Sequence, residues 1–418
     1  MIKELYQLKK ENLSLILPIF LIIFFPISLL LGSAIINIST IILSIFFLYE
    51  SLKNKNFSFI NNFYFKLLFI FFLSLIINIF FSNHVHLDFS RQIGFLRFVF
   101  FVFALDFFLN YQSGKFKNFI FKSWFIIFII VTFDLLFEFI FGFNSLGFKS
   151  YMPGRLAGFL GEELKIGNYY FGFILLSISY LFYNNKKYKF NLLIIISFLI
   201  MGFLIGERSN FIKIFLSISI FLFFLEKPKF QTKLLSLLSV ALLIILITIF
   251  NQNIKTRALQ ILGPVKDNGI INYIKTSHYG VHYHTAISIF NNNKLFGVGL
   301  KQFRYESNKT EYDENKNNIY NRDNWSTHPH QIHFEILSET GIFGYLIFIF
   351  FFISILFKSI KNYQKKSNKY LLSSIIFIII SLLPLLPSGS FFTTFSASIF
   401  WLNFGVMLSS QNEYKKKR

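Results

Sequence analysis

The sequence contains no cysteine among its 418 residues, which excludes disulfide bonds and thiol chemistry. Charged residues are also scarce, at 15% of the chain, whereas hydrophobic residues make up 54%. A soluble protein usually carries about 25% charged residues. Apart from residues 251–332, the chain has no polar stretch long enough for a separate soluble domain. These deficits point to a protein embedded in a membrane.

The first apolar run follows MIKELYQLKKEN and has no small-residue cleavage site after it. We therefore expect a retained membrane helix and not a signal peptide. Stretches of about 20 apolar residues, each long enough to cross a bilayer, recur along the chain. They predict an all-α integral membrane protein with about twelve spans, at residues 13–32, 34–51, 64–82, 93–111, 119–141, 169–184, 191–205, 210–226, 233–250, 333–357, 370–387 and 391–410.

Acidic residues are few, with 20 Asp and Glu against 41 Lys and Arg. In a membrane protein this surplus holds loops on the cytoplasmic side and contacts anionic lipid, so we expect membrane lipid and no nucleic acid as partner. Lysines gather in alternate loops, for example at 227–233 and 358–369. This asymmetry predicts cytoplasmic termini and an outer loop at 251–332.

The prediction divides the chain into three parts. Residues 1–250 carry the first nine spans and their arginine-bearing outer loops. Residues 251–332 form the large outer loop with short helices, periplasmic if the cell has two membranes. Residues 333–418 carry the last three spans and a basic tail.

Arginine is distributed differently from lysine. Arg97 lies inside an expected span and Arg418 in the tail, and the other six arginines fall on the outer side. The positive-inside tendency does not explain them, whereas the planar guanidinium suits phosphate. The outer side is therefore predicted to bind an anionic ligand, although scattered surface arginines explain some of these positions equally well. The six are Arg91, Arg155, Arg208, Arg257, Arg304 and Arg322.

Two motifs give their arginines a context. Arg155 stands in GRLAGFLGEELKIG, where Glu162 or Glu163 is expected to orient it. Arg208 stands in IGERSNF at the start of an expected helix, whose N-terminus adds partial positive charge. We interpret this second motif as a seat for pyrophosphate. The alternatives are a glycine-rich loop with an internal ion pair, and a Glu207–Arg208 pair that marks the membrane boundary.

Three histidines occur in STHPHQIHF. With Ser326 or Thr327 as helix cap, His330 falls in the first turn of the next helix, whose N-terminus keeps an imidazole neutral. A neutral His330 is suited to act as a base. Zinc binding by His328, His330 and His333 is less favoured, because no HExxH pattern or paired outer carboxylates accompany them. A purely structural polar cap is the third interpretation.

A second group of histidines lies in and just before VHYHTAISIF, where the apolar spacing predicts a helix at the outer surface. Solvated or structural roles are the more usual ones for such histidines. The group consists of His278, His282 and His284.

In this order, the motifs resemble the O-antigen ligase family, which shares its signature with lipid-linked O-antigen polymerases. The signature is a histidine, a polar residue, nine residues, a glycine, two residues and a small residue. Here these are His330, Gln331, Gly341 and Gly344. The two arginine motifs, the preceding STHPH and the upstream GVGLKQFR also look like members of this family.

The resemblance implies a GT-C-like membrane glycosyltransferase of the bacterial inner membrane, with its active site facing the periplasm. Such an enzyme passes a glycan from undecaprenyl pyrophosphate to lipid A–core or another glycan, with inversion and without metal or other cofactor. His330 would be the base, and Arg155 and Arg208 would hold the pyrophosphate. The other expected substrate contacts are Arg304, Glu163, His328, His333 and His282.

The sequence departs from the family pattern at two places. Gln331 stands where asparagine is usual. The stretch TSHYGVHY lacks an arginine that many members carry, so His278, His282 or Arg304 is expected to replace it.

Two other functions remain open at this point. A polymerase would perform the same chemistry on another growing glycan. A lipid-linked sugar transporter would need a polar path, yet few charges lie inside the spans, mainly Asp106, Asp134 and Glu138.

Overall fold

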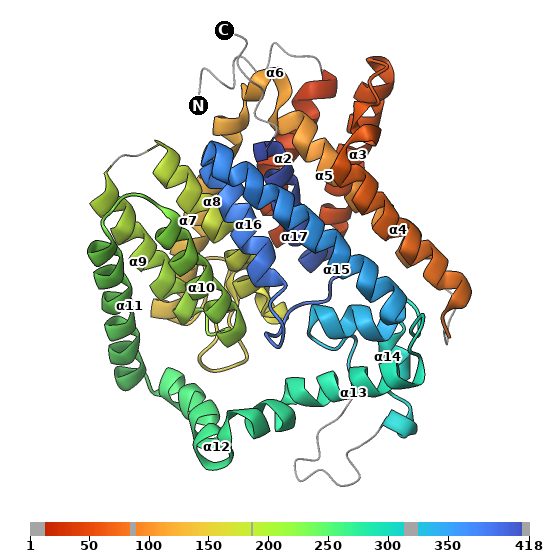
Figure 1. The fold of residues 1–418 in the computed structure, drawn as a ribbon. Helices are drawn as coiled ribbons and strands as arrows, with labels where there is room; N and C mark the ends of the chain where they lie inside the picture. Colours follow the sequence, from red (N-terminus) through yellow and green to blue (C-terminus); the bar gives the residue numbers. More distant parts are fainter. Residues whose placement is uncertain (1–12, 84–88, 185–186, 313–324, 412–418) are drawn as a thin grey trace.

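The computed structural model describes residues 13–83, 89–184, 187–312 and 325–411, and within them every regular element is a helix (Figure 1). The predictions for Arg322, for the N-terminal lysines and for the basic tail fall outside these residues. Twelve helices overlap the twelve expected spans one by one. They are α2 (Leu13–Leu31), α3 (Ser33–Lys53), α4 (Phe63–Phe81), α5 (Ser90–Leu109), α7 (Lys117–Phe141), α8 (Ile166–Asn184), α9 (Tyr188–Leu204), α10 (Arg208–Phe224), α11 (Phe230–Phe250), α15 (Ile332–Lys366), α16 (Lys369–Ser381) and α17 (Thr394–Gln411).

The remaining elements are short or lie outside the bundle. Residues between α11 and α15 form α12, α13 and α14 at the end of the molecule opposite α6 (Figure 1), and we call this the lower end. The elements are η1 (Ser58–Asn61), α6 (Tyr111–Gly114), η2 (Gly158–Glu163), α12 (Gln252–Thr276), α13 (His278–Asn292), α14 (Phe303–Glu306) and η3 (Thr310–Tyr312).

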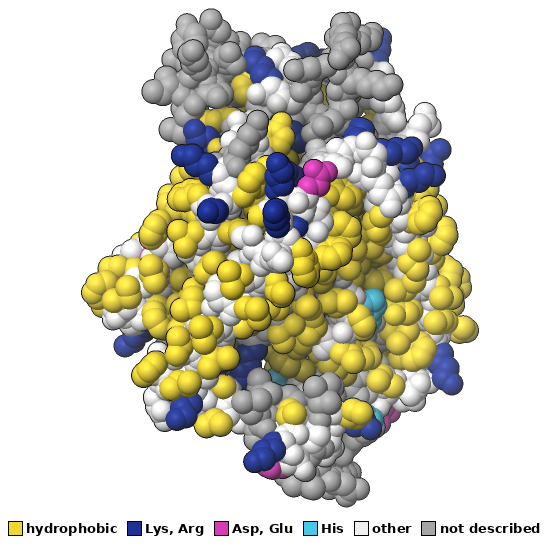
Figure 2. Space-filling model, turned by 60° about the vertical axis from the view of Figure 1, so that its left-hand side comes forward, with side chains coloured by type: hydrophobic (Ala, Val, Ile, Leu, Met, Phe, Trp, Pro, Cys, Tyr) yellow, Lys and Arg dark blue, Asp and Glu magenta, His cyan; other side chains and the backbone are white. Residues whose placement is uncertain are grey.

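Eight of the described helices are long and apolar enough to cross a membrane: α2, α3, α4, α5, α7, α8, α11 and α15. Shorter apolar helices, α9 and α16, accompany them. Figure 2 shows hydrophobic side chains over the middle of one face, with Lys and Arg gathered toward its two ends. The prediction of an α-helical, multi-pass membrane protein is confirmed, and the count of twelve spans stays a prediction.

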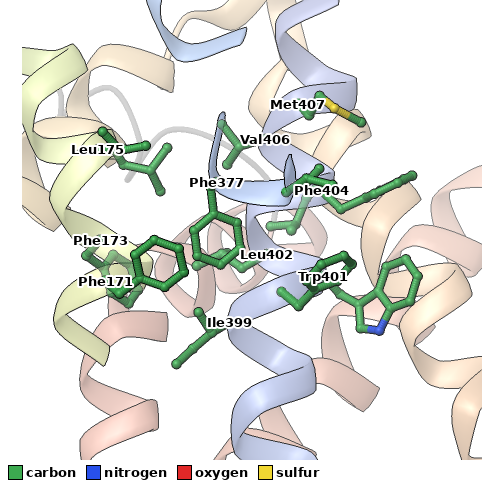
Figure 3. Packing of buried hydrophobic residues seen from close by; sticks show 14 of the residues in the cluster. Phe171, Phe173, Leu175, Phe377, Ile399, Trp401, Leu402, Phe404, Val406 and Met407 are labelled. Carbon is green, nitrogen blue, oxygen red and sulfur yellow. The ribbon is translucent and has the colours of Figure 1, made fainter. Parts of the chain in front are cut away.

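Helix α17 forms the centre of the bundle, buried along almost its whole length and packed against α5, α16, α3 and α8. Phe171 and Phe173 of α8 and Phe377 of α16 lie on one side of α17 and Trp401 on the other (Figure 3), where its ring contacts Phe95 of α5 and Phe351 of α15. Lipid is as apolar as these side chains, so close packing and buried polar contacts hold the helices together. Asn403 Nδ2 accordingly donates to Gly172 O of α8 at 3.1 Å. A Cβ at Gly172 would lie 2.5 Å from Ile399, so only glycine permits this approach.

Two acidic residues of α7 have a structural role. Glu138 accepts hydrogen bonds from the backbone amides of Ala157 and Gly158, both at 2.7 Å. Asp134 accepts from Ser145 N at 2.9 Å. These carboxylates fix the loop that carries Arg155 against the lower end of α7.

Helix α15 is broken at Gly341, whose backbone angles are φ 64° and ψ −170°. A short piece, residues 332–340, precedes the break, and the long apolar piece follows it. A break of this kind leaves carbonyls and amides without helical partners. The turn at residues 294–299 supplies them, through the bonds Val298 N→Ser338 O at 3.1 Å, Gly299 N→Glu339 O at 2.9 Å, Ile342 N→Lys294 O at 2.8 Å and Phe343 N→Leu295 O at 3.2 Å.

The sequence alone suggests that Gly341 and Gly344 let their helix pack closely against another span, but this expectation is wrong. A Cβ at Gly341 would lie 2.4 Å from the carbonyl of Leu295, in the turn before α14. One at Gly344 would meet Thr340 of the same helix at 2.3 Å. Glycine is required at 341 because the backbone is left-handed there and because a backbone segment crosses it.

We predict that Gly341→Ala destabilises the protein more than Gly142→Ala does. Both glycines have positive φ, which costs an alanine roughly 1 kcal/mol, but space around Gly142 is open for a Cβ. Thermal unfolding in detergent, followed by intrinsic fluorescence, measures the two melting temperatures. Equal decreases would contradict the role of the 294–299 turn.

Candidate functional site

A cavity of about 800 Å³ opens at the lower end of the bundle. Its wall includes residues of α3, α5 and α10, the loop before α17, and the histidine segment before α15. Four of the eight predicted site residues line the cavity, and the other four do not. Those on the wall are His328, His330, Arg304 and Glu163.

His330 precedes α15 and is not in its first turn, contrary to the prediction. The helix begins at Ile332, and its cap is Gln331, whose side chain accepts from Phe334 N at 3.1 Å. Neither Ser326 nor Thr327 caps it. His330 itself has a left-handed backbone with φ 55°, which favours glycine or asparagine over histidine.

The loop between α16 and α17 holds this conformation in place. Ser388 N donates to His330 O at 2.7 Å, and Lys213 Nζ donates to Pro387 O at 2.6 Å. The loop is longer than expected, because α16 ends at Ser381 instead of 387 and α17 begins at Thr394 instead of 391. Two prolines in LLPLLPSGS explain the early end, since proline donates no backbone hydrogen bond and disfavours helix before it.

Glu335 connects this loop to the rest of the site. Its carboxylate is fully buried, pairs with Lys301 Nζ at 3.1 Å and accepts from Phe391 N at 2.7 Å. The Ser390 hydroxyl donates to the same carboxylate. Lys301, in the turn between α13 and α14, is buried, and its amide donates to Glu339 at 2.8 Å. Glu335 and Glu339, one helical turn apart in an apolar run, were the signal that sequence reasoning missed.

Four histidine rings meet at this place. The centroid of the His330 ring lies 4.1 Å from that of His328, 5.4 Å from that of His282 and 6.4 Å from that of His278. The Nε2 atom of His330 is 3.3 Å from Ser326 Oγ. Among the described residues, no group of three or more His, Asp or Glu is placed to hold a metal ion.

Burial, together with the nearby His328, His282 and His278, lowers the pKa of His330 to about 3, while Glu335 opposes them. Burial likewise lowers the pKa of His328 to about 3, assisted by the charge of Lys301. Both imidazoles are therefore neutral at pH 7. The neutral state was expected from a helix N-terminus, whereas its cause here is burial among other basic groups.

The remaining two predicted histidines, His282 and His333, do not line the cavity. His282 is buried in α13, with its Nε2 atom 3.4 Å from that of His278. His333 turns away from His330: its Nε2 atom is 2.7 Å from Leu382 O and its Nδ1 atom 3.2 Å from Tyr345 Oη. The spacing of the two histidines suggests that His333 supports the same face as His330, but the structure does not place it there.

Arg155 is oriented by Glu207 and not by Glu162 or Glu163. Its Nη2 atom lies 3.4 Å from the Glu207 carboxylate and donates to Leu164 O at 2.6 Å. Glu163 is exposed and pairs with Lys165 at 3.0 Å. Burial raises the pKa of Glu207, and the charge of Arg155 opposes that shift.

Arg208 and Arg257 complete a cluster around Arg155. Arg208 donates to the backbone carbonyl of Arg257, and Arg257 Nη2 donates to Gly206 O at 3.0 Å. Burial lowers the pKa of Arg257, and the charges of Arg208 and Arg155 lower it further. Three arginines thus gather near one carboxylate, and the sequence placed Arg257 only among the outer arginines, without linking it to Arg155 and Arg208.

Glycines of both arginine motifs make this cluster possible. A Cβ at Gly206 would lie 2.0 Å from Gly154 O, and one at Gly154 would lie 2.6 Å from the Arg257 side chain. Tyr279 links the cluster to the histidines, because it acts electrostatically on Arg257 and its ring lies 5.4 Å from that of His330.

Comparison with known proteins agrees with the motifs. The family model described as O-antigen ligase matches residues 190–349, a range that contains Arg208, Arg257 and His330. No curated protein matches the chain. The match confirms the resemblance that the motifs indicated, and it supports a membrane enzyme of the O-antigen ligase or polymerase type.

We predict that the protein loses stability as the pH falls below about 6.5. His328 and His330 have folded-state pKa values of about 3, so between about pH 3 and 6.5 the unfolded chain binds protons that the folded chain does not. The free energy of unfolding then falls by up to about 1.4 kcal/mol per pH unit for each histidine, and this loss is absent above pH 7.

The melting temperature from pH 8 to pH 5 measures this dependence. His330→Asn, which suits the left-handed backbone, is expected to flatten the slope. His284→Asn removes an exposed histidine of α13 and is expected to keep it. If the melting temperature of wild type and of His330→Asn fell equally with pH, the conclusion that the folded protein keeps His330 neutral would be refuted.

We also predict that Glu335→Gln lowers the free energy of unfolding by about 3–5 kcal/mol, because it leaves the buried ammonium of Lys301 without its charged partner. The double variant Glu335→Gln/Lys301→Met should lose less than the sum of the two single changes. Denaturant unfolding of the four proteins measures the coupling. Glu163→Gln, in an exposed ion pair, is the control and should change stability by less than about 1 kcal/mol. Additive losses at 335 and 301 would rule out the coupling.

Proposed function

Because residues 190–349 carry the O-antigen ligase domain, we propose that this protein transfers a glycan from undecaprenyl pyrophosphate to a sugar hydroxyl of lipid A–core. In this proposal it acts in the bacterial inner membrane, with the cavity facing the periplasm. One observation carries the proposal: His330, a half-buried imidazole with a strongly lowered pKa, lines a cavity, and Tyr279 connects it to the cluster of three arginines.

The proposed reaction is a single displacement. The hydroxyl oxygen of the acceptor attacks the anomeric carbon of the donor sugar, and its proton passes to a ring nitrogen of His330. The bond between the anomeric carbon and the pyrophosphate oxygen breaks, and undecaprenyl pyrophosphate leaves with that electron pair. The configuration at the anomeric carbon is inverted. All atoms are accounted for without a metal or cofactor.

The three-arginine cluster is the proposed seat of the pyrophosphate. Arg155, Arg208 and Arg257 face one carboxylate, Glu207, so the cluster keeps a surplus of positive charge. Fixed cations close to a leaving group stabilise the charge that develops there. Arg155 and Arg208 do not line the cavity themselves, although Glu207, beside both of them, does. Arg304 lines the cavity and supplies a cation next to the histidines.

The low pKa of His330 fits a base that becomes active only with substrate. With a pKa of about 3, the imidazole of His330 is by itself a weak base. An anionic pyrophosphate nearby favours imidazolium and raises the pKa toward neutrality, where general-base catalysis is most effective. In this proposal, binding of the donor raises the pKa of His330, which then accepts the proton of the acceptor hydroxyl.

Three further residues have secondary roles in this proposal. His328 and Glu163 contact sugar from the wall, where polar groups are available for hydroxyls. His282 packs behind His330, with ring centroids 5.4 Å apart, and keeps it from turning inward.

We predict that His330→Asn lowers the transfer rate by about 10²–10⁴-fold, the usual contribution of a general base. Purified protein in proteoliposomes, with labelled lipid-linked glycan and lipid A–core, measures the rate. His284→Asn is the matched control and should transfer at the wild-type rate. Equal rates for wild type and His330→Asn would overturn the mechanism.

The acceptor decides between ligase and polymerase. If a second lipid-linked glycan replaces lipid A–core as the better acceptor, the protein is a polymerase with the same catalytic group. If donor is consumed with neither acceptor glycosylated, the proposed function fails.

A further inference from the structure

Arg97 lies in α5, two turns from the end of the helix at the cavity. Its Nη2 atom lies 3.4 Å from Thr394 Oγ1, and its guanidinium stands 4.7 Å from the ring of Phe98. The buried Nε atom has no hydrogen-bond partner, and no described carboxylate lies within 4.0 Å of this side chain. Arg97 is therefore a charged group with almost none of its donors used.

A guanidinium this deep in an apolar helix is costly unless an anion compensates it. The other carboxylates near the cavity are already committed, Glu335 to Lys301 and Glu207 to Arg155. The compensating charge is thus expected from a molecule that enters the cavity.

The surroundings of Arg97 are those of an anion site. Arg91 lies on the same wall and acts electrostatically on it, so two positive charges face one space. Thr394 and Asn37, joined by a 3.2 Å hydrogen bond, border that space with polar groups. Gly94 leaves room beside the guanidinium, since a Cβ there would lie 3.7 Å from Arg97 Nη1.

We propose that Arg97 binds a phosphate group of a lipid-linked substrate, at a subsite separate from the three-arginine cluster. A planar guanidinium fork matches two phosphate oxygens, and the neighbouring Thr394 hydroxyl and Asn37 amide offer further polar contacts to them. The subsite shares one cavity with His330, so a lipid held there places its sugar within the reaction space. The identity of the lipids rests on the proposed function.

The phosphate has two possible sources, the pyrophosphate of the donor lipid and a phosphate of the acceptor lipid. Binding to the purified protein in nanodiscs is measured by native mass spectrometry with three probes: undecaprenyl pyrophosphate, lipid A–core, and lipid A–core after phosphatase treatment. Arg97→Met is compared with wild type, and Arg97→Gln replaces it if that variant does not fold.

We predict that removal of the Arg97 charge weakens binding of one phosphate-bearing lipid by at least about tenfold, the usual contribution of a charge-assisted hydrogen bond. Weaker binding of undecaprenyl pyrophosphate identifies the donor. Weaker binding of intact, but not dephosphorylated, lipid A–core identifies the acceptor. Arg97→Lys, which keeps the charge but loses the planar fork, should recover only part of the affinity.

Asp106→Asn is the matched control, because it removes a charge from the same helix at the other end, beside a separate cavity. It should bind all three probes as wild type does. The proposal is overturned if Arg97→Met binds every probe as tightly as wild type, or if it weakens the dephosphorylated lipid equally. These outcomes require no transfer, so they stand even if wild-type protein fails to move a glycan.

Discussion

The buried carboxylate of Glu335 is the contact on which the lower end of the molecule depends. It joins three segments that are distant in sequence: the first turn of α15, the turn that carries Lys301 and the loop before α17 that carries Ser390. A buried ion pair contributes little net stability, but the loss of one partner is expensive, so the pair specifies one arrangement strongly. His330 stands five residues before this carboxylate, and the loop that carries Ser390 also binds its backbone carbonyl, through Ser388 N.

Acidic residues are scarce in this protein, and the ones near the cavity serve as anchors. Glu138 and Asp134 hold the Arg155 loop, Glu207 holds Arg155, and Glu335 holds Lys301. Their charges are spent on amides and cations of the protein itself. The arginines that remain on or near the cavity therefore outnumber the carboxylates, which makes the site electrostatically attractive to phosphate.

The parts of the structure that local sequence determines were predictable. Apolar runs located the helices to within several residues, and the spacing of His330 and Gly341 indicated the family that the comparison confirms. The contacts that build the site could not be predicted, because they join residues far apart in the chain. Arg257 reaches Arg155 from another helix, and the left-handed backbone of His330 depends on a loop that the prediction assigned to two spans. Only tertiary packing fixes such features.

The clamp around Gly341 also has a consequence for the order of assembly. The turn at 294–299 leaves the ribosome before residues 338–343, whose backbone groups it needs as partners. Until α15 arrives, those amides and carbonyls must be satisfied by water, which is plentiful outside a bilayer and absent inside it. The 294–299 turn must therefore remain on the aqueous side of the membrane until α15 has been made. The histidine site forms only after α15, the tenth expected span, has been inserted. The candidate site is thus completed as one of the last steps of biosynthesis.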